Sequence, residues 1–327
     1  MKVSIIVPIY NVAPYIADCL RSVMRQTYTG SIECLLVDDC GTDDSICIAE
    51  QMIVEYDGTI IFRILHHEVN RGLSVARNTG TLQATGDYLF FLDSDDVITD
   101  DCIELLMEKV AENTDIEMVQ GNAIWHRPGK ESLVMIKQII LPLALTNEDV
   151  RICRYQYRQL CVNVWNKLLK RDFILRNNIL CKEDILFEDN LWSFYLLKYL
   201  QKAAFVYDTT YIYNYRRQSI TTSADKRTVG YYYGIIYRDI LENLTPLYEQ
   251  KECDYYAREV SEACVKYIKD APELYSVFIL FKEKCKQCGC KTPQLRLSVA
   301  MLLGQLSCGW PIWVTLARLK NLLKLVF

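Results

Sequence analysis

The segment that decides the fold is Asp87-Tyr88-Leu89-Phe90-Phe91-Leu92-Asp93-Ser94-Asp95-Asp96. Its apolar part predicts a buried strand, and three carboxylates follow at the carboxyl end of that strand. Carboxylates this close together repel one another unless a cation neutralises them. The Asp-x-Asp spacing puts Asp93 and Asp95 on the same side of an extended segment, where both can face one Mg²⁺ or Mn²⁺. The alternative is an Asp-rich turn that caps a helix beginning near Asp100.

The residues before this segment show strands that alternate with helices. Apolar, β-branched runs predict three earlier strands, and apolar residues at helical spacing predict three helices. We expect the strands at 3–8, 32–37 and 60–65, and the helices at 14–27, 44–55 and 74–84. This alternation is typical of right-handed crossovers in a parallel, doubly wound α/β sheet, expected in roughly the first 120 residues. Beyond residue 125 the pattern favours strand and loop to Leu145 and then helices.

Polar residues follow the other predicted strands as well. The strand ends carry Pro8-Ile9-Tyr10-Asn11 and Val37-Asp38-Asp39. Ligands of open α/β sheets bind outside the carboxyl ends of the strands, and carboxylates there are suited to hydrogen bonding with a base or a ribose. The sequence has no G-x-G-x-x-G turn and no P-loop, which argues against a dinucleotide-dependent dehydrogenase and a nucleoside triphosphatase.

A third polar segment is Asn70-Arg71-Gly72-Leu73-Ser74-Val75-Ala76-Arg77-Asn78-Thr79-Gly80. It places a glycine before a helix that carries Arg77 and Asn78. Guanidinium groups match the oxygens of a diphosphate, so both arginines of the segment are candidates for binding one. The alternative is that Arg71 or Arg77 forms an ordinary salt bridge at the surface.

Together these segments resemble the motifs of the family 2 glycosyltransferases. The resemblance rests on five motifs in order, within about 95 residues, which makes a chance match improbable. They are Ile5 to Asn11, Ser22 to Tyr28, Val37 to Asp39, Asn70 to Gly80 and Leu92 to Asp96. It implies the GT-A fold, an α/β fold with a Rossmann-like nucleotide-sugar-binding sheet, here followed by a mainly helical C-terminal extension.

The resemblance also implies which residues bind the donor. The Pro8 and Tyr10 loop and Asp39 would hold the uracil and ribose of a nucleotide sugar, and Arg77 would border the nucleotide pocket. Asp93 with Asp95 would handle the ribose and the metal, either Mn²⁺ or Mg²⁺. The full expected donor-binding set is Pro8, Tyr10, Asn11, Asp39, Arg71, Arg77, Asn78, Asp93, Ser94 and Arg217.

The later part of the chain resembles the same family. Val164-Trp165-Asn166-Lys167-Leu168-Leu169 and Phe187-Glu188-Asp189-Asn190-Leu191-Trp192 match its Trp-Asn-Lys-Leu and Glu-Asp motifs. By that resemblance Asp189 is the catalytic base, which removes the proton from the attacking sugar hydroxyl. The alternative is that Glu188 and Asp189 are favourable charges in the first turn of a helix. Arg217 follows in a segment that resembles the one closing over the diphosphate.

The resemblance implies an inverting, metal-dependent hexosyltransferase that moves a sugar, with a UDP-sugar as the expected donor. The acceptor is a hydroxyl of a glycan or a lipid-linked saccharide, and the expected process is surface polysaccharide biosynthesis. Two alternatives stay open: an inactive nucleotide-sugar-binding protein of the same fold, and a metal-dependent nucleotidyltransferase. The segment after the first strand, Pro8-Ile9-Tyr10-Asn11-Val12, lacks the Gly-rich loop with Lys or Arg that a nucleotidyltransferase would have there.

Composition narrows the class further. Of the 327 residues, 51% are apolar and 24% charged, as in folded globular proteins, which excludes long disorder and a polytopic membrane protein. The net charge of −4 argues against a nucleic-acid partner. The 14 cysteines lie scattered in apolar stretches, which favours a reducing compartment and a cytoplasmic location. The sequence does not indicate an oligomeric state.

The C-terminal end differs from the rest because no acidic residue follows Glu283. Residues 295–327 combine an apolar helical face with Arg318, Lys320 and Lys324, a pattern suited to peripheral contact with the inner face of the plasma membrane. A packing or dimerisation helix fits the same pattern equally well. The expected domains are a catalytic domain (1–220), with its nucleotide-sugar-binding part (1–120) and its acceptor and base part (121–220), and a helical region (221–327).

Overall fold

The computed structural model of the 327-residue chain forms two compact units, residues 1–216 and 217–327. The structure describes residues 1–127, 129, 131–135, 144–146, 149–150, 161–215, 224–244 and 250–287.

The first unit begins with the predicted parallel sheet. Its strands are β1 (Lys2–Ile9), β2 (Ser31–Asp38), β3 (Ile61–His66) and β4 (Tyr88–Phe91), in the order β3-β2-β1-β4. The helices between them are α1 (Ile16–Met24), α2 (Ser45–Glu55) and α3 (Leu73–Gln83). All three strand pairings are parallel, which confirms the doubly wound sheet expected in this part of the chain.

The same sheet continues with strands from the later half of the unit. The order runs from β4 to β9 (Lys167–Lys170), β6 (Met118–His126), β10 (Lys202–Asn214) and β5 (Val97–Ile98). Strand β9 is antiparallel to both neighbours, so β6 and β10 run in the same direction as β4. The short strands β7 (Leu133–Val134) and β8 (Ala144–Thr146) pair with β6 and β10.

The prediction of helices alone beyond Leu145 is therefore wrong for two segments. Strand β9 lies in the Trp-Asn-Lys-Leu segment, and β10 has 13 residues, with five aromatic or β-branched positions in its last six. Both are strands because each completes a ladder in a sheet whose other members lie far away in sequence. The remaining helices of this unit are α4 (Cys102–Glu112), α6 (Arg171–Arg176) and α7 (Glu188–Tyr199).

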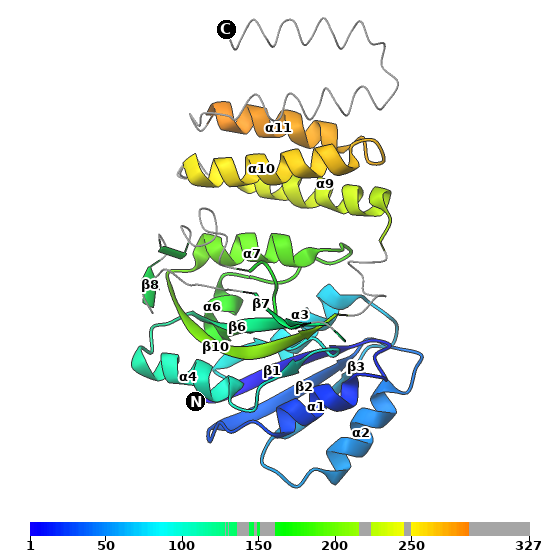
Figure 1. Cartoon of the computed structure of the whole chain (residues 1–327), viewed down its shortest axis with the longest axis vertical. Coiled ribbons are helices and arrows are strands. Elements are labelled where there is room, and N and C mark those ends of the chain that lie inside the picture. The colour runs from blue at the N-terminus through cyan, green and yellow to red at the C-terminus, as the bar shows by residue number, and fades with distance from the viewer. Residues whose placement is uncertain are drawn as a thin grey trace, which may run out of the picture. The chain divides into compact units, whose positions relative to one another are not determined.

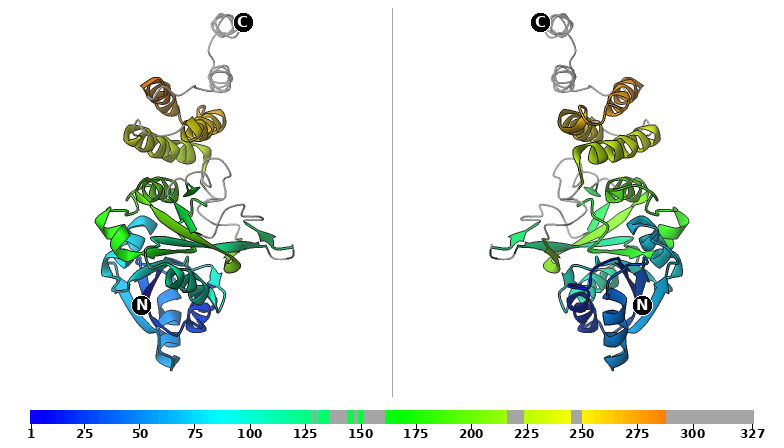
Figure 2. Two further views of the ribbon diagram at one scale, coloured as in Figure 1. Left: turned by 90° about the vertical axis from the view of Figure 1, so that its left-hand side faces the viewer. Right: turned by 90° about the vertical axis from the view of Figure 1, so that its right-hand side faces the viewer.

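Helices cover both faces of the sheet. Figure 1 and Figure 2 show α1 and α2 on one side and α7 on the other. A hydrophobic core lies on the α1 and α4 side, where Ile5, Phe90 and Leu106 are fully buried. On the opposite face α3 approaches β1 closely at Gly80, where a Cβ would lie 2.3 Å from Cγ2 of Ile6. This close approach fixes the helix that carries Arg77 and Asn78 at a set height above the strands.

The second unit contains three described helices, α9 (Lys226–Asn243), α10 (Gln250–Tyr267) and α11 (Leu274–Gln287). Asp225 caps α9 by accepting a hydrogen bond from the Thr228 N–H. Within the described ranges no helix has both the length and the apolarity to cross a membrane. The segment 295–327, for which we predict a membrane or packing role, lies outside the described residues.

Candidate active site

Three polar turns meet at the carboxyl edge of β1, β2 and β4, as the sequence predicts. Pro8 is buried within β1, whereas Tyr10, just past the strand, is 49% exposed. Asn11 has a left-handed backbone (φ 51°), and its Oδ1 accepts a 2.7 Å hydrogen bond from the Thr42 N–H. The loop after β1 is thereby tied to the turn after β2, and it presents the Tyr10 ring to solvent.

The carboxylate of Asp39 holds the next loop in place. It is buried and accepts hydrogen bonds from the N–H groups of Arg71 (2.9 Å) and Gly72 (2.8 Å). His67 Nδ1 lies 2.7 Å from the same carboxylate, and its Nε2 lies 2.9 Å from Thr79 Oγ1. Gly72 has φ 84°, a conformation that favours glycine. Nothing in the sequence pattern singled out His67, because its link to Asp39 exists only after β2 and β3 pair.

The acidic turn after β4 divides its carboxylates between two tasks. Asp96 is 1% exposed and accepts hydrogen bonds from the Tyr211 hydroxyl and the Asn214 N–H, both 2.8 Å. Burial, together with the charges of Asp95 and Asp93, raises the pKa of Asp96 well above its usual range. Asp96 thus fastens β10 to the turn, whereas Asp93 and Asp95 remain partly exposed.

Arg77 connects the acidic turn to the start of α7. Its guanidinium donates a 2.7 Å hydrogen bond to Asp93 and a second one to Glu188. Burial alone would lower the pKa of Arg77, but Asp93 and Glu188 outweigh this effect and raise it. With only 3% of Arg77 exposed, the alternative of an ordinary surface salt bridge is wrong for this residue. Glu188 is a member of the site that the sequence showed only as a neighbour of Asp189.

Asp189 lies in the first turn of α7. Phe187, the residue just before α7, has a left-handed backbone (φ 62°), which sets the direction in which α7 starts. Asp189 Oδ1 accepts 2.9 Å hydrogen bonds from both the N–H and the side-chain amide of Asn190. Burial and then repulsion from Glu188 raise the pKa of Asp189 to about 7, against the opposing effect of Arg77. A carboxylate with that pKa can accept a proton near neutral pH.

The other predicted donor-binding residues lie as follows. Ser94 is buried within the acidic turn, and Arg71 is exposed beyond the Asp39 loop. The Asn78 side chain is buried and pairs with the backbone of Cys181 through two 2.8 Å hydrogen bonds, so it fixes the approach to α7. Arg217 lies outside the described residues.

The carboxylates of the acidic turn fit a divalent cation whose remaining coordination positions are filled by substrate phosphates. Among the described residues no group of three or more His, Cys, Asp or Glu side chains could enclose a metal ion. Asp93 and Asp95 offer two carboxylates at one edge, and Mg²⁺ is commonly bound by one or two carboxylates plus substrate phosphates. Asp93 is 24% exposed even though one of its oxygens accepts the hydrogen bond from Arg77.

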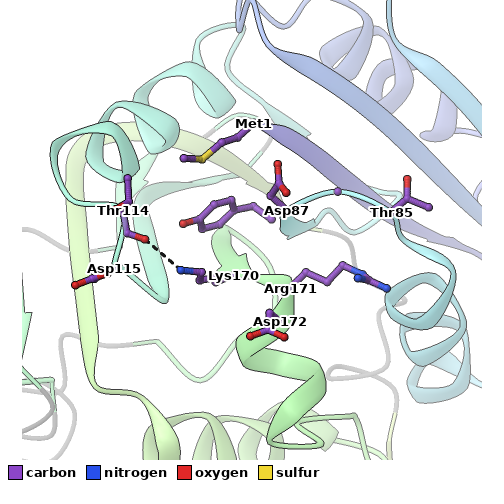
Figure 3. Close-up of a pocket in the computed structure, with 10 residues that line it drawn as sticks. Met1, Thr85, Asp87, Thr114, Asp115, Lys170, Arg171 and Asp172 are labelled. Atoms are coloured by element: carbon purple, nitrogen blue, oxygen red, sulfur yellow. Dashed lines mark hydrogen bonds between the residues drawn. The ribbon is translucent and has the colours of Figure 1, made fainter.

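A separate pocket lies at the opposite edge of the sheet. Figure 3 shows it beside Met1, with Asp87, Lys170 and Arg171 among its lining residues. Two of its charged groups are engaged within the protein, since Asp87 accepts from the Lys2 N–H and Lys170 donates to the Thr114 carbonyl. The carboxyl edge therefore remains the candidate active site.

Comparisons with known proteins identify the family of the chain. The model of Glycosyl transferase family 2 matches residues 4–171. The glycosyltransferase EpsJ of Bacillus subtilis (strain 168) is 33% identical over 222 residues, 67% of this chain and 62% of EpsJ. YibD, a glycosyltransferase of Escherichia coli (strain K12), is 31% identical over 223 residues, 67% of this chain and 63% of YibD. The similarity therefore spans less than two thirds of the length of these relatives.

Solved structures show the same fold. TarS 1-349 of S. aureus in complex with UDP-GlcNAc has a TM-score of 0.70 at 20% identity, covering 94% of this chain and 89% of that one. The mannosyltransferase PcManGT from Pyrobaculum calidifontis in complex with GDP-Man and Mn²⁺ has a TM-score of 0.58 at 14% identity, with 94% and 87% covered. Since the family model also matches just over half of the chain, the protein belongs to glycosyl transferase family 2 and has the GT-A fold.

Proposed function

We propose that this protein transfers a sugar from a nucleoside-diphosphate donor, with a UDP-sugar preferred, to a hydroxyl of a glycan or a lipid-linked saccharide. The observation that carries the proposal is the chain of charges from Asp93 through Arg77 to Glu188, with Asp189 beside it. It places a carboxylate with a pKa of about 7 next to the turn that suits a diphosphate and its cation. Such a pair is suited to the displacement of a diphosphate by a hydroxyl.

The donor side of the proposal rests on the two turns after β1 and β2. Tyr10 presents an exposed ring that can stack on a base, and Asn11 fixes the loop that carries it. Asp39 orients the Arg71 and Gly72 backbone beside them. We assign Pro8, Ser94 and Asn78 to shaping this pocket, since all three are buried.

Asp93 and Asp95 would hold the divalent cation, Mn²⁺ or Mg²⁺. When bound there, the cation would neutralise the negative charge that develops on the departing nucleoside diphosphate. Arg77 holds Asp93 in a fixed orientation through its 2.7 Å hydrogen bond. Because PcManGT is a structural neighbour in complex with Mn²⁺, that ion is the first one to test.

Asp189 would accept the proton of the acceptor hydroxyl as its oxygen attacks the anomeric carbon. In a single displacement the attacking and leaving groups lie on opposite sides of that carbon, so the anomeric configuration inverts. No carboxylate nucleophile is needed because a neutralised diphosphate leaves readily. Glu188 raises the proton affinity of Asp189, which makes Asp189 a better base.

We assign the catalytic role to residues 1–220 and place the reaction in surface polysaccharide biosynthesis. Residues 221–327 would position the enzyme, with the 295–327 segment in peripheral contact with the inner face of the plasma membrane. Loss of membrane association after deletion of 292–327, measured by sedimentation, would support this location.

A donor screen tests the proposed function. The protein is incubated with Mn²⁺ and a panel of UDP- and GDP-sugars, including UDP-GlcNAc and GDP-Man, with and without oligosaccharide acceptors, while nucleoside diphosphate release is followed. Acceptor-stimulated release supports transfer. Tight donor binding without release would instead indicate a nucleotide-sugar-binding protein, and release of pyrophosphate from a nucleoside triphosphate and a sugar phosphate would indicate a nucleotidyltransferase.

A further inference from the structure

A row of aromatic side chains starts at the acidic turn and runs outward over β6 and β10. Trp125 on β6 pairs with Tyr213 on β10 and with Leu133 on β7, so these three side chains lie on one face of the sheet. Arg127 and Tyr215 follow two residues further along and lie on the same face by alternation. Strands β6 and β10 run side by side to this end of the sheet (Figure 1).

The rings of this row contact one another in sequence. Trp165 stacks on Tyr211 with centroids 4.4 Å apart and on Tyr213 at 5.8 Å. Trp125 then contacts Tyr213 at 6.0 Å and Tyr215 at 6.1 Å. We call Tyr211, Trp165, Tyr213, Trp125 and Tyr215 the aromatic row. It passes from a fully buried ring at Tyr211 to a 36% exposed ring at Tyr215.

The buried end of the row is attached to the candidate active site. The Tyr211 hydroxyl donates to Asp96 (2.8 Å) and accepts from the Asp93 N–H (3.2 Å). Asn214, which separates the last two tyrosines of the row, donates its N–H to Asp96 and its side-chain amide to the Asp95 carbonyl (3.1 Å). The outer rings are therefore held in register with the turn that carries Asp93 and Asp95.

Trp125 of the row and the neighbouring Arg127 each have a polar group without a hydrogen-bond partner in the described part of the chain. The Trp125 indole N–H and the Arg127 Nε are shielded from water, yet neither makes a hydrogen bond there. The Arg127 guanidinium lies 3.9 Å from the Trp125 ring centre and 5.3 Å from that of Tyr215. Shielded donors without acceptors are costly, which points to a ligand that supplies acceptor oxygens.

We propose that the outer part of the aromatic row, Trp125, Tyr213 and Tyr215 with Arg127, binds pyranose rings of an acceptor glycan. A pyranose presents an apolar face of C–H groups, which suits aromatic rings, and a rim of hydroxyl oxygens, which suits unpaired N–H donors. The row starts at the acidic turn, so a glycan on it extends away from its reacting end. This inference rests on the proposed function and identifies the acceptor as a saccharide of at least two rings, bound beyond the reacting sugar.

Binding to two probes tests the inference. Wild-type protein and the variants Trp125→Ala and Tyr215→Ala are applied to an array of defined oligosaccharides and, in parallel, to phosphatidylglycerol-containing vesicles. The expected result is oligosaccharide binding that each variant weakens about tenfold, the equivalent of about 1.4 kcal/mol. Tyr215→Phe keeps the ring and should bind like wild type. Tyr207→Ala removes a 44% exposed tyrosine from β10 outside the row and should also bind like wild type.

The remaining outcomes overturn the inference. It is wrong if no oligosaccharide binds, if the two alanine variants bind as well as wild type, or if the row binds only vesicles. Nucleoside diphosphate release from the nucleotide-sugar panel in the presence of acceptor, measured on the same proteins, separates failure of the aromatic row from failure of the proposed function. If wild type releases the diphosphate while the variants bind glycans normally, only the aromatic row fails. If wild type binds glycans but turns over no donor, the proposed function fails.

Discussion

The two acidic turns at the carboxyl edge use their carboxylates differently. After β2, Asp39 is buried, and both of its oxygens accept hydrogen bonds from the backbone of the next loop. After β4, Asp93 and Asp95 stay partly exposed, and Asp93 faces a buried arginine that leads to α7. The first turn therefore fixes a loop, whereas the second can still exchange partners with a ligand.

This difference separates two kinds of expected effect. Substitutions in the turn after β4 and at the start of α7 should alter the chemical step with little effect on stability. Substitutions in the turn after β2, where Asp39 holds the loop of Arg71 and Gly72, should alter stability and donor affinity together. The following substitutions test that division, beginning with the largest expected effect.

Asp189→Asn should lower the rate of sugar transfer on the order of 10³-fold, because an amide cannot accept the acceptor proton. Donor binding should stay close to wild type, since Asp189 makes no hydrogen bond to the donor-side loops among the described contacts. Transfer kinetics and donor titration by calorimetry provide the two measurements. A variant with near-normal turnover would remove Asp189 from the mechanism.

Asp95→Asn should lower transfer roughly 100-fold at fixed Mn²⁺ and shift the Mn²⁺ requirement to higher concentration. The reason is the loss of one of the two carboxylates that fit the cation. Activity is measured against Mn²⁺ concentration, with Asp39→Asn as the matched control at the other turn. An equal shift in both variants would break the distinction between the turns.

The pH profile of kcat should rise about tenfold per unit below a midpoint near 7 and level off above it. Protonated Asp189 cannot act as a base, so activity follows its ionised form. The raised pKa has the opposite effect on stability: its contribution is full at acidic pH and is lost as the pH rises through about 7. In Asp189→Asn the residual activity should lack this midpoint, and a profile that keeps it would assign the midpoint to another group.

Asp39→Asn should weaken donor binding about tenfold and lower the free energy of unfolding by about 1–3 kcal/mol. Asparagine has only one acceptor oxygen, so one of the two loop N–H groups loses its partner. Donor KM and thermal unfolding are measured together. A raised KM with unchanged stability would mean that Asp39 contacts the nucleotide instead of acting through the loop.

Asn78→Ala should have the smallest effect on activity. It removes two 2.8 Å hydrogen bonds to the Cys181 backbone, which should cost roughly 2 kcal/mol and lower Tm by about 5 °C. Donor KM should remain within about twofold of wild type. A large rise in donor KM without a change in Tm would indicate that Asn78 contacts the donor directly.

The sequence predicted one half of the sheet much better than the other. Strands β1 to β4 are local runs rich in apolar residues, and the first three are each followed by a helix, so their periodicity is sufficient to locate them. Strand β10 carries aromatic and β-branched residues near its end, but its pairing with β6 and β5, which makes all 13 residues a strand, cannot be deduced from that local pattern.

The candidate site divides in the same way. Asp39 and Asp93 were predicted because each follows a strand, and Asp189 because its segment resembles a motif of the family. The contacts between these segments could not be predicted from the sequence. His67 reaches Asp39, and Glu188 reaches Arg77, only after distant segments have packed. Residue type and spacing indicate which groups carry charge, whereas the fold decides which charge each of them meets.

The ion pair between Arg77 and Glu188 also bears on how the protein can be divided. The two residues lie 111 positions apart in sequence, so the pair forms only after a long loop has closed. The stretch that matches the family model ends at residue 171, before both α7 and β10. A fragment cut there would leave Arg77 without one carboxylate and β6 without its neighbour β10. The boundary of the family signature is therefore not a boundary at which this chain can be cut and still fold.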